Sequence, residues 1–429
     1  MHASGLGSDL AGQGVRLAVE LGKPAAVLEW IERFRAGALR RKPVRPPSDA
    51  RLAGDLAQLR RVTAELAEAT AAGTDSRALR AEQLQLEEAV RHRSRHAQGS
   101  RIPVRGFDAE QLLATLGDRA LVEILRVDDA LLAVTGAQGR LRIHQLGAYA
   151  DAMRELESVR FSLHRLARRH GSPASLAAAN AGLAHATSAL DRLLIGPLLE
   201  VVRDRELVIV PTGQLHALPW PTLPSLRGRP LVVAPSATTW LAAMHAANVH
   251  RGGPGRIAFV AGPHLDHADD EVRAVAALYR QPKVLTGPQA TADAVRHTMD
   301  GAQLVHIAAH GRFRADNPQF SAIDLADGPL TVYDLERVRR GPRQLVLSAC
   351  DSGLSAVHAG DELMGLAGAV FSLGTSTLIA SVVPVADDDA MALMVELHRE
   401  LCAGAAPAHA LATAQLRVQV DGFVCFGAA

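Results

Sequence analysis

The chain has 429 residues, of which 48% are hydrophobic and 21% are charged, and its formal net charge is +1. This length predicts two or three domains, and the composition is close to that of an average globular protein. The small net charge does not indicate a partner of opposite charge. Three cysteines in a chain of this length exclude a disulfide scaffold and fit a reducing compartment. With no signal peptide apparent at the start, we expect a cytoplasmic protein.

Residues 1–100 are predicted to form a helical region. Apolar side chains recur at helical spacing over residues 15–40, and a Gly-Lys-Pro break at Gly22 divides this stretch into two helices. Residues 50–97 show helical spacing on both sides of Gly73, which predicts a long helical hairpin.

A group of basic residues follows the first two predicted helices. Such a group can bind nucleic acid, but aromatic residues make up only 3% of the chain and are scarce here. We therefore expect a solvated helix end and linker, and no nucleic-acid partner. The group consists of Arg33, Arg35, Arg40, Arg41, Lys42 and Arg45.

Residues 105–250 are predicted to form a second part, in which short strands precede and follow a helical insertion. The strands are expected at 120–126, 130–135, 141–146, 207–210 and 231–234, and the helices at about 147–170 and 174–203.

Residues 255–429 show a regular alternation of strands and helices. This pattern predicts an α/β fold with a mainly parallel six-stranded sheet and helices on both faces. The stretch 312–342 is expected to be mostly irregular, apart from a short apolar piece at 322–325. Long loops at a strand end often carry substrate contacts. The strands are expected at 256–261, 283–285, 303–309, 343–348, 376–381 and 422–426. The helices are expected at 268–279, 290–298, 361–373, 388–402 and 407–419.

One uncharged stretch, residues 363–386, is long enough to span a bilayer. Several glycines, a Ser/Thr-rich segment and Pro384 interrupt it. We therefore interpret it as a buried helix, a turn and a buried strand, and expect no membrane association.

Two of the predicted strands end in reactive side chains, the first before His310-Gly311 and the second before Cys350. Because the carboxyl ends of parallel strands meet at one edge of a sheet, we expect the imidazole and the thiol to lie together. That pair is the constellation of a cysteine hydrolase, with Cys350 as nucleophile and His310 as general base. The amides of Gly311 and Cys350 are the expected oxyanion donors.

Other reactive residues are assigned simpler roles. His306 lies inside a predicted strand, where a satisfied core histidine is expected, and Cys402 and Cys425 are expected to pack. A His/Asp-rich segment could bind zinc in principle, but its spacing matches no strong metal motif, so we expect no metal and no cofactor. That segment contains His264, Asp266, His267, Asp269 and Asp270.

Several sequence blocks occur together in the order found in one known family. His310-Gly311 and the segment from Ser348 to Gly353 resemble the CHAT domain, a caspase- and separase-like cysteine peptidase fold. Residues 15–40 also resemble the last repeat of a tetratricopeptide array, so the chain is expected to start within such an array. The other matching blocks are 215–220, 234–237, 360–366 and 379–388, and the resemblance covers roughly residues 105–429.

The resemblance implies a degenerate caspase-like half over 105–250 and an active half over 255–429. It also implies an endopeptidase that uses Cys350 and His310 to cleave a protein or peptide substrate. A regulatory protein partner would then act through the N-terminal helices. One departure from the family pattern is Val383, which stands where the family often has tryptophan before the proline.

Asp387 and Asp388 lie just after a predicted strand, where separase-like relatives keep an acidic residue that faces the first substrate pocket. A carboxylate there would favour Arg or Lys before the scissile bond. The alternative is a helix start, where carboxylates complement the helix dipole. Two alternatives to the peptidase also stay open, namely a scaffold with an idle dyad and an acyl transferase with the same thioester chemistry.

Overall fold

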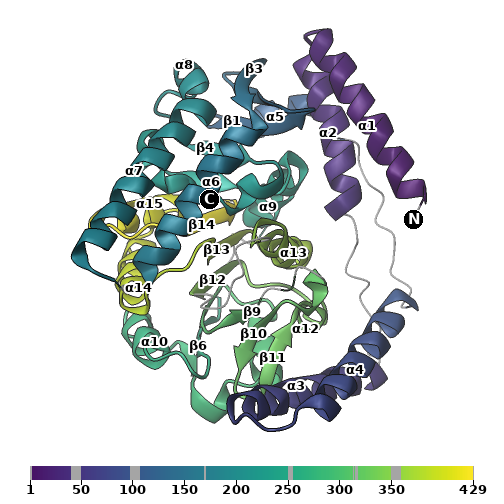
Figure 1. Ribbon diagram of the computed structural model, residues 1–429, viewed down its shortest axis with the longest axis vertical. Helices are drawn as coiled ribbons and strands as arrows, with labels where there is room; N and C mark the ends of the chain where they lie inside the picture. The colour runs from purple at the N-terminus through teal and green to yellow at the C-terminus, as the bar shows by residue number, and fades with distance from the viewer. Residues whose placement is uncertain are drawn as a thin grey trace.

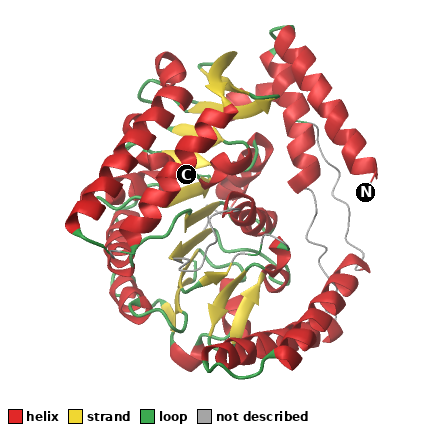
Figure 2. Cartoon of the chain, viewed as in Figure 1, coloured by secondary structure: helices red, strands yellow, loops and turns green. Residues whose placement is uncertain are grey.

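The computed structural model describes residues 2–39, 50–96, 107–168, 171–249, 255–312, 314, 317–348 and 359–428. In this part of the chain the fold is built on one eleven-stranded sheet, in the order β3-β2-β1-β4-β5-β14-β13-β12-β8-β6-β7. Figures 1 and 2 show this sheet running through the molecule with helices around it.

The C-terminal half of the sheet contains the six strands that the sequence predicts, and this prediction is confirmed. Five of them run parallel, while the sixth is antiparallel to its neighbour. Most of these strands are short, continuous apolar runs buried on both faces, as parallel strands usually are. The six are β6 (Ile257–Ala261), β7 (Lys283–Leu285), β8 (Leu304–Ala308), β12 (Gln344–Ser348), β13 (Thr377–Ser381) and β14 (Phe423–Gly427).

The N-terminal half contributes the other five strands. They are β1 (Ala120–Val127), β2 (Ala130–Ala137), β3 (Arg140–Ala148), β4 (Leu207–Val210) and β5 (Leu231–Val233). β14 joins the halves, because it pairs in parallel with β5 and antiparallel with β13. The parallel strands of one half therefore run opposite to those of the other half. Consequently, the carboxyl ends of the two parallel groups lie at opposite edges of the sheet.

Two layers of helices cover the sheet. On one face, the core contains side chains of α6 (Tyr149–Ala167), α7 (Pro173–Leu194), α11 (Ala292–Met299) and α13 (Ala359–Ser372). On the other face it contains side chains of α5 (Ala109–Leu116), α9 (Ala237–Val249), α10 (Ala268–Ala276), α14 (Asp387–Cys402) and α15 (Pro407–Val418). The remaining short helical pieces are α8 (Leu199–Val202) and the 3-10 turns η1 (Gly196–Leu198), η2 (Gly213–Ala217), η3 (Trp220–Thr222), η4 (Pro224–Leu226) and η5 (Gly287–Gln289).

The N-terminal helices form two hairpins, as predicted. The first consists of α1 (His2–Glu20) and α2 (Pro24–Leu39), and the second of α3 (Ala50–Ala71) and α4 (Arg77–His96). Figure 1 shows that they lie at opposite ends of the molecule. The first hairpin packs on the N-terminal half, where the buried Glu32 carboxylate accepts the Ala237 and Thr238 amides at the start of α9. Arg35 of the same hairpin bonds Glu123 of β1 at 2.8 Å.

The segment after His310 is more regular than the sequence predicts. It forms a small antiparallel sheet, in the order β11-β10-β9. The expectation of a mostly irregular stretch is therefore wrong, but the apolar piece predicted at 322–325 is confirmed as a strand, β10. β9 has only two residues, and β11 contains Gly328 and Pro329, which disfavour a strand assignment. The elements are β9 (Gly311–Arg312), η6 (Pro318–Phe320), β10 (Ala322–Leu325), β11 (Gly328–Thr331) and α12 (Val332–Leu335).

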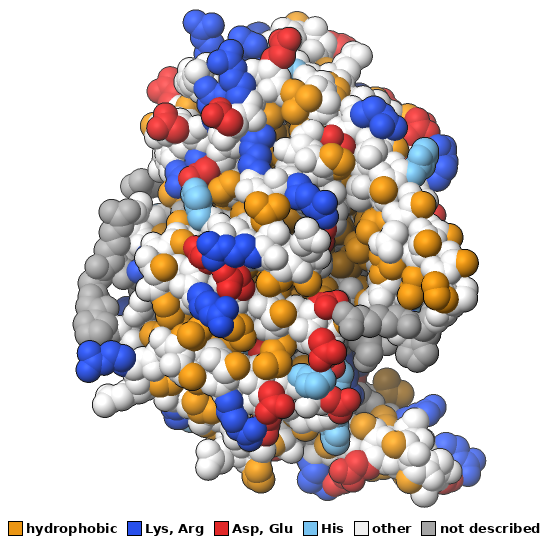
Figure 3. All heavy atoms as spheres, turned by 90° about the vertical axis from the view of Figure 1, so that its left-hand side faces the viewer, with side chains coloured by type: hydrophobic (Ala, Val, Ile, Leu, Met, Phe, Trp, Pro, Cys, Tyr) orange, Lys and Arg blue, Asp and Glu red, His pale blue; other side chains and the backbone are white. Residues whose placement is uncertain are grey.

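The uncharged stretch 363–386 lies within α13, β13 and the turns next to them. Within the described ranges, no helix has the length and apolar character needed to cross a membrane. Figure 3 shows basic, acidic and apolar side chains interspersed over the face that carries α7 and α14. That mixture agrees with the small net charge of +1.

Candidate active site

The strands that lead to His310 and Cys350 are direct neighbours. β8 and β12 pair in parallel, and their last residues, Ala308 and Ser348, are partners in the register. His310 follows Ala308 by two positions, and Cys350 follows Ser348 by two positions in the sequence. Cys350 lies outside the described residues, as does all of 349–358. The predicted pairing of the two strands is confirmed, and the position of the thiol remains a prediction.

A backbone carbonyl orients the His310 ring. The Nε2 atom lies 2.8 Å from the carbonyl oxygen of His264, in the loop between β6 and α10. A carbonyl oxygen only accepts, so Nε2 carries the hydrogen and donates it. In the neutral ring this leaves the lone pair on Nδ1, which is the nitrogen able to take a proton. His310 is half-buried and so retains access to solvent.

Close backbone packing holds this loop against the end of β8. The Gly262 amide donates to the Ala308 carbonyl at 2.7 Å. A Cβ atom at Gly262 would lie 2.4 Å from the Ala309 Cβ and 2.6 Å from the Asp324 carbonyl, so only glycine fits. The His264 backbone has a φ of 62°, in the left-handed region. Sequence reasoning missed the role of His264, because a backbone carbonyl leaves no trace in the residue type.

The small sheet fixes the other side of His310. The Asp324 amide donates to the His310 carbonyl at 2.8 Å, and Gly311 pairs with Ile323 of β10. Gly311 is buried at this junction. Its predicted role as an oxyanion donor, together with the Cys350 amide, remains a prediction.

Asp387 and Asp388 begin α14, as the helix-start interpretation expects. Asp387 is half-buried, and burial raises the pKa of its carboxyl, while the nearby imidazoles of His310 and His267 act in the opposite direction. The Asp387 carboxyl therefore lies within electrostatic range of the predicted base. Asp388 instead contacts His267, at 3.2 Å from Nε2. Their role in a substrate pocket remains a prediction.

The His/Asp-rich segment is divided among several roles. The His264 carbonyl orients His310, and Asp269 and Asp270 both pair with Arg273 of their own helix. Over the residues that the structure describes, no group of three or more His, Cys, Asp or Glu side chains could hold a metal ion.

The remaining histidine and cysteine predictions have different outcomes. His306 is fully buried and hydrogen-bonded, which confirms a satisfied core histidine. Cys425 is buried in β14, and burial raises the pKa of its thiol to about 12. Cys402 is exposed at the end of α14, so the expected packing role is wrong for this residue.

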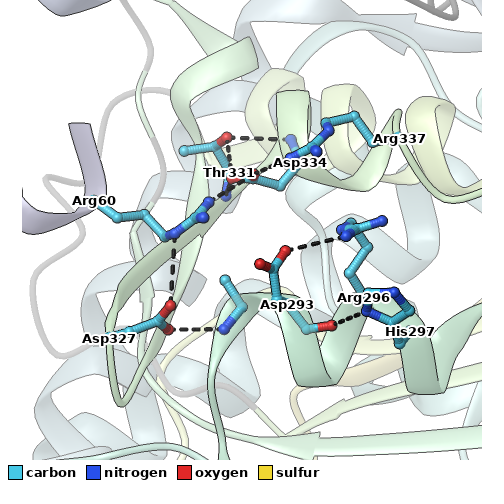
Figure 4. A network of polar contacts seen from close by, with 9 residues as sticks. Arg60, Asp293, Arg296, His297, Asp327, Thr331, Asp334 and Arg337 are labelled. Carbon is cyan, nitrogen blue, oxygen red and sulfur yellow. Dashed lines mark hydrogen bonds and ion pairs between the residues drawn. The ribbon is translucent and has the colours of Figure 1, made fainter. Parts of the chain in front are cut away.

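A buried ion pair joins the second helical hairpin to the small sheet beside His310. Arg60 of α3 lies 2.7 Å from Asp334 of α12 and 3.7 Å from Asp327, which follows β10 (Figure 4). The Asp327 carboxylate also accepts the Ala292 amide at 2.7 Å. Around this pair, apolar side chains of the hairpin pack on Phe320 and Tyr333. The hairpin thus contacts β11, β11 pairs with β10, and β10 holds the backbone of His310.

Residues 185–422 match the family model described as CHAT domain. No curated protein matches the sequence. Two crystal structures of the separase–securin complex of Saccharomyces cerevisiae are similar in fold, each at 10% identity, with TM-scores of 0.55 and 0.52. The matches cover 74% and 82% of this chain but only 30% and 33% of the separase chains, so this chain spans about a third of their length. A complex of the pro- and mature domains of RgpB from Porphyromonas gingivalis matches at 13% identity over 63% of this chain and 75% of that chain. Its TM-score of 0.40 is too low to support an inference.

Proposed function

This chain belongs to the CHAT domain family, and we propose that it is a cysteine endopeptidase that cleaves a protein or peptide substrate with His310 and Cys350. The observation that carries the proposal is the register of β8 and β12, whose last residues are partners and precede the two reactive residues by two positions each. The hydrogen bond from His310 Nε2 to the His264 carbonyl adds an orienting group, which a catalytic base needs.

The reaction follows from these groups. His310 Nδ1 takes the proton of the Cys350 thiol, and the thiolate attacks the scissile carbonyl carbon. The amides of Gly311 and Cys350 donate to the oxyanion of the tetrahedral intermediate. When this intermediate collapses, the C–N bond breaks and the leaving amine takes the proton from His310. Water, deprotonated by the same imidazole, then hydrolyses the thioester and restores the thiol.

We assign Asp387 to the first substrate pocket. The residue is half-buried beside His310, and its carboxyl could pair with an Arg or Lys side chain before the scissile bond. A panel of peptides that differ only at that position tests the assignment. Preference for Arg or Lys that disappears in Asp387→Asn supports it, and equal cleavage of Arg, Met and Asp peptides contradicts it.

The second helical hairpin is the proposed site of regulation. Arg60 and the apolar cluster join it to the small sheet that fixes the His310 backbone. A protein partner that shifts the hairpin would therefore shift the base. The yeast separase structures contain securin, a protein bound to that relative, which makes a protein partner a reasonable expectation for this chain.

One observation favours the alternative of an interaction scaffold with an idle dyad. Leu10, Leu17 and Leu21 of the first hairpin are 62%, 57% and 58% exposed. Leu10 and Leu17 lie along one side of α1 and Leu21 is in the turn after it, and exposed leucines at this spacing are typical of a surface that binds another helix.

An active-site thiol experiment decides between the two functions. The unmodified protein is treated with iodoacetamide at pH 7 with and without a peptide panel, and labelled cysteines are identified by mass spectrometry. Rapid labelling of Cys350, together with loss of cleavage in Cys350→Ala but not in Cys402→Ala, supports the peptidase. If Cys350→Ala cleaves as well as the unmodified protein, the assignment is wrong.

A further inference from the structure

A buried polar network lies directly behind the two strand ends of the candidate site. Glu271 of α10 is 3% exposed, and its carboxylate has two partners. One oxygen lies 2.8 Å from His306 Nε2 of β8, and the other lies 3.1 Å from Ser348 Oγ of β12. A carboxylate only accepts, so both partners donate to it.

The network continues away from the site through α14. His306 Nδ1 lies 3.1 Å from His398 Nε2, and His398 Nδ1 lies 2.8 Å from the Tyr279 hydroxyl. Phe259 of β6 lies against three of these rings, at centroid distances between 5.3 and 5.9 Å. His306 and His398 are both 0% exposed, and burial lowers the pKa of His398 well below its ordinary value.

The position of Glu271 distinguishes it from an ordinary core contact. His306 precedes His310 by four residues, and Ser348 precedes Cys350 by two. Glu271 also follows His264, whose carbonyl orients the His310 ring, by seven residues in the same loop-and-helix segment. This one segment therefore contacts the strand of the base, the strand of the nucleophile and the base itself.

The cost of the arrangement argues for a role beyond packing. A buried carboxylate is expensive unless charged or hydrogen-bonded partners satisfy it, and replacement of such groups by apolar residues is often neutral for stability. The other buried residues on this face of β8 and β12 are apolar, namely Leu304, Ala308 and Val346. Apolar residues would therefore fit here as well, but they would not tie one strand to the other through a single side chain.

We infer that Glu271 is a positioning residue for the dyad, which holds the ends of β8 and β12 at the separation that His310 and Cys350 need. This inference rests on the proposed peptidase function. The bridging carboxylate fixes the position of one strand end relative to the other. Because Glu271 is part of α10, it also fixes both strand ends relative to the His264 loop, which precedes this helix.

Ser348→Ala tests the inference with the smallest structural change, since it removes only the tether to β12. The matched control is Ser376→Ala. Ser376 is 1% exposed, and its hydroxyl donates to the Arg343 carbonyl at 2.8 Å. Arg343 directly precedes the first residue of β12, at the end of the strand away from the dyad. Both variants remove a hydrogen bond that a buried serine makes at one end of β12, but only the Ser348 end precedes the dyad.

The readouts are kcat and KM for the peptide that the unmodified protein cleaves fastest, the rate of Cys350 alkylation by iodoacetamide, and Tm. We expect Ser348→Ala to lower kcat and the alkylation rate by about tenfold with KM unchanged, because small misplacements of catalytic groups cost this much or more. Ser376→Ala should lower Tm by a similar amount and change neither rate. Glu271→Gln keeps the shape of the side chain and can hydrogen-bond both partners. It should therefore keep most of the activity that is lost in Glu271→Leu.

The outcomes separate the two claims. If Cys350→Ala abolishes cleavage while Ser348→Ala and Ser376→Ala affect kcat equally, the peptidase stands and the positioning role of Glu271 is wrong. If Ser348→Ala lowers Tm alone, the network is a packing feature and the inference is again overturned. If Cys350→Ala keeps full activity, the proposed function fails, and the inference fails with it.

Discussion

The two halves of the sheet each hold a histidine against a backbone carbonyl, and the proposed peptidase uses only one of these histidines. In the N-terminal half, His216 Nδ1 lies 3.0 Å from the Gly213 carbonyl. In the C-terminal half, His310 Nε2 lies 2.8 Å from the His264 carbonyl. Burial lowers the pKa of His216 to about 4, so its ring stays neutral, whereas His310 is half-buried with Asp387 nearby.

If the proposed function holds, the difference indicates what a catalytic histidine needs besides an orienting carbonyl. It needs access for a substrate, and a strand neighbour that ends in a second reactive residue. The N-terminal half offers neither, because His216 is enclosed and the positions two after the ends of β4 and β5 are Thr212 and Pro235, which carry no thiol or imidazole. A carbonyl contact alone is therefore a packing feature.

Substitution of the two histidines should give opposite phenotypes. We expect His310→Ala to lower kcat for the best peptide by about 10²–10⁴-fold, the range for loss of a general base. His216→Asn should leave kcat within about twofold and lower the free energy of unfolding by about 1–2 kcal/mol, as buried polar substitutions do. Steady-state kinetics and urea unfolding measure both quantities. Equal kinetic losses in the two variants would show that the halves do not differ in this way.

The C-terminal half is also the half that the second hairpin contacts. Arg60→Ala should destabilise this contact by about 3 kcal/mol, because it leaves the buried Asp334 carboxylate without its closest cation. Hydrogen exchange at β11 measures the effect. Arg61→Ala is the neighbouring control, since its pair with Glu65 is exposed and should contribute about 0.3 kcal/mol. Similar exchange rates in the two variants would contradict a buried, stabilising pair.

Each half contains one buried glutamate through which the pH dependence of stability can be compared. Burial raises the pKa of Glu336 to about 8, and that of Glu123 to about 8 although Arg35 acts against it. A carboxyl whose pKa is raised in the folded state keeps its proton to a higher pH there than in the unfolded state. Stability is therefore full below about pH 4.5 and falls as the pH rises toward 8.

Glu336→Gln should remove the loss of stability at high pH that Glu336 causes in the C-terminal half. We expect the Tm difference between the variant and the unmodified protein to be small at pH 5 and to grow by about 2–4 °C at pH 9. Glu123→Gln should gain less, because it leaves Arg35 without its buried partner. A Glu336→Gln benefit that does not change between pH 5 and pH 9 contradicts the assignment.

The smallest expected effect concerns the two described cysteines. Iodoacetamide should label exposed Cys402 at an ordinary rate and should not label Cys425 in the folded protein, because that thiol is buried and its pKa is raised to about 12. Cys402→Ala should leave kcat unchanged. Labelling of Cys425 in native buffer at the rate of Cys402 would indicate that β14 opens far more often than its central place suggests.

Some features could be predicted from the sequence because they depend on the pattern of side chains. The six C-terminal strands are continuous apolar runs, and their order along the chain predicted a parallel sheet that brings β8 and β12 together. The small sheet was missed, since β9 has only two residues and β11 contains glycine and proline. The sequence also could not indicate that β14 pairs with both halves.

Some residues of the candidate site could likewise be predicted from the sequence, and others could not. His310 and Asp387 were identified by residue type and by their place after a strand. The His264 carbonyl was not, because backbone groups are the same at every residue. Glu271 was not considered from the sequence, because its burial between His306 and Ser348 depends on contacts 35 and 77 residues away in the chain.

The place of β14 has a consequence for synthesis of the chain. β14 is the last of the eleven strands in the sequence but the sixth in the sheet, between β5 and β13. Until residues 423–427 leave the ribosome, both flanking strands present unpaired hydrogen-bonding edges, which are prone to aggregate. Pairing of β14 with β5 and β13 covers both of these edges in one step and joins the two halves of the sheet.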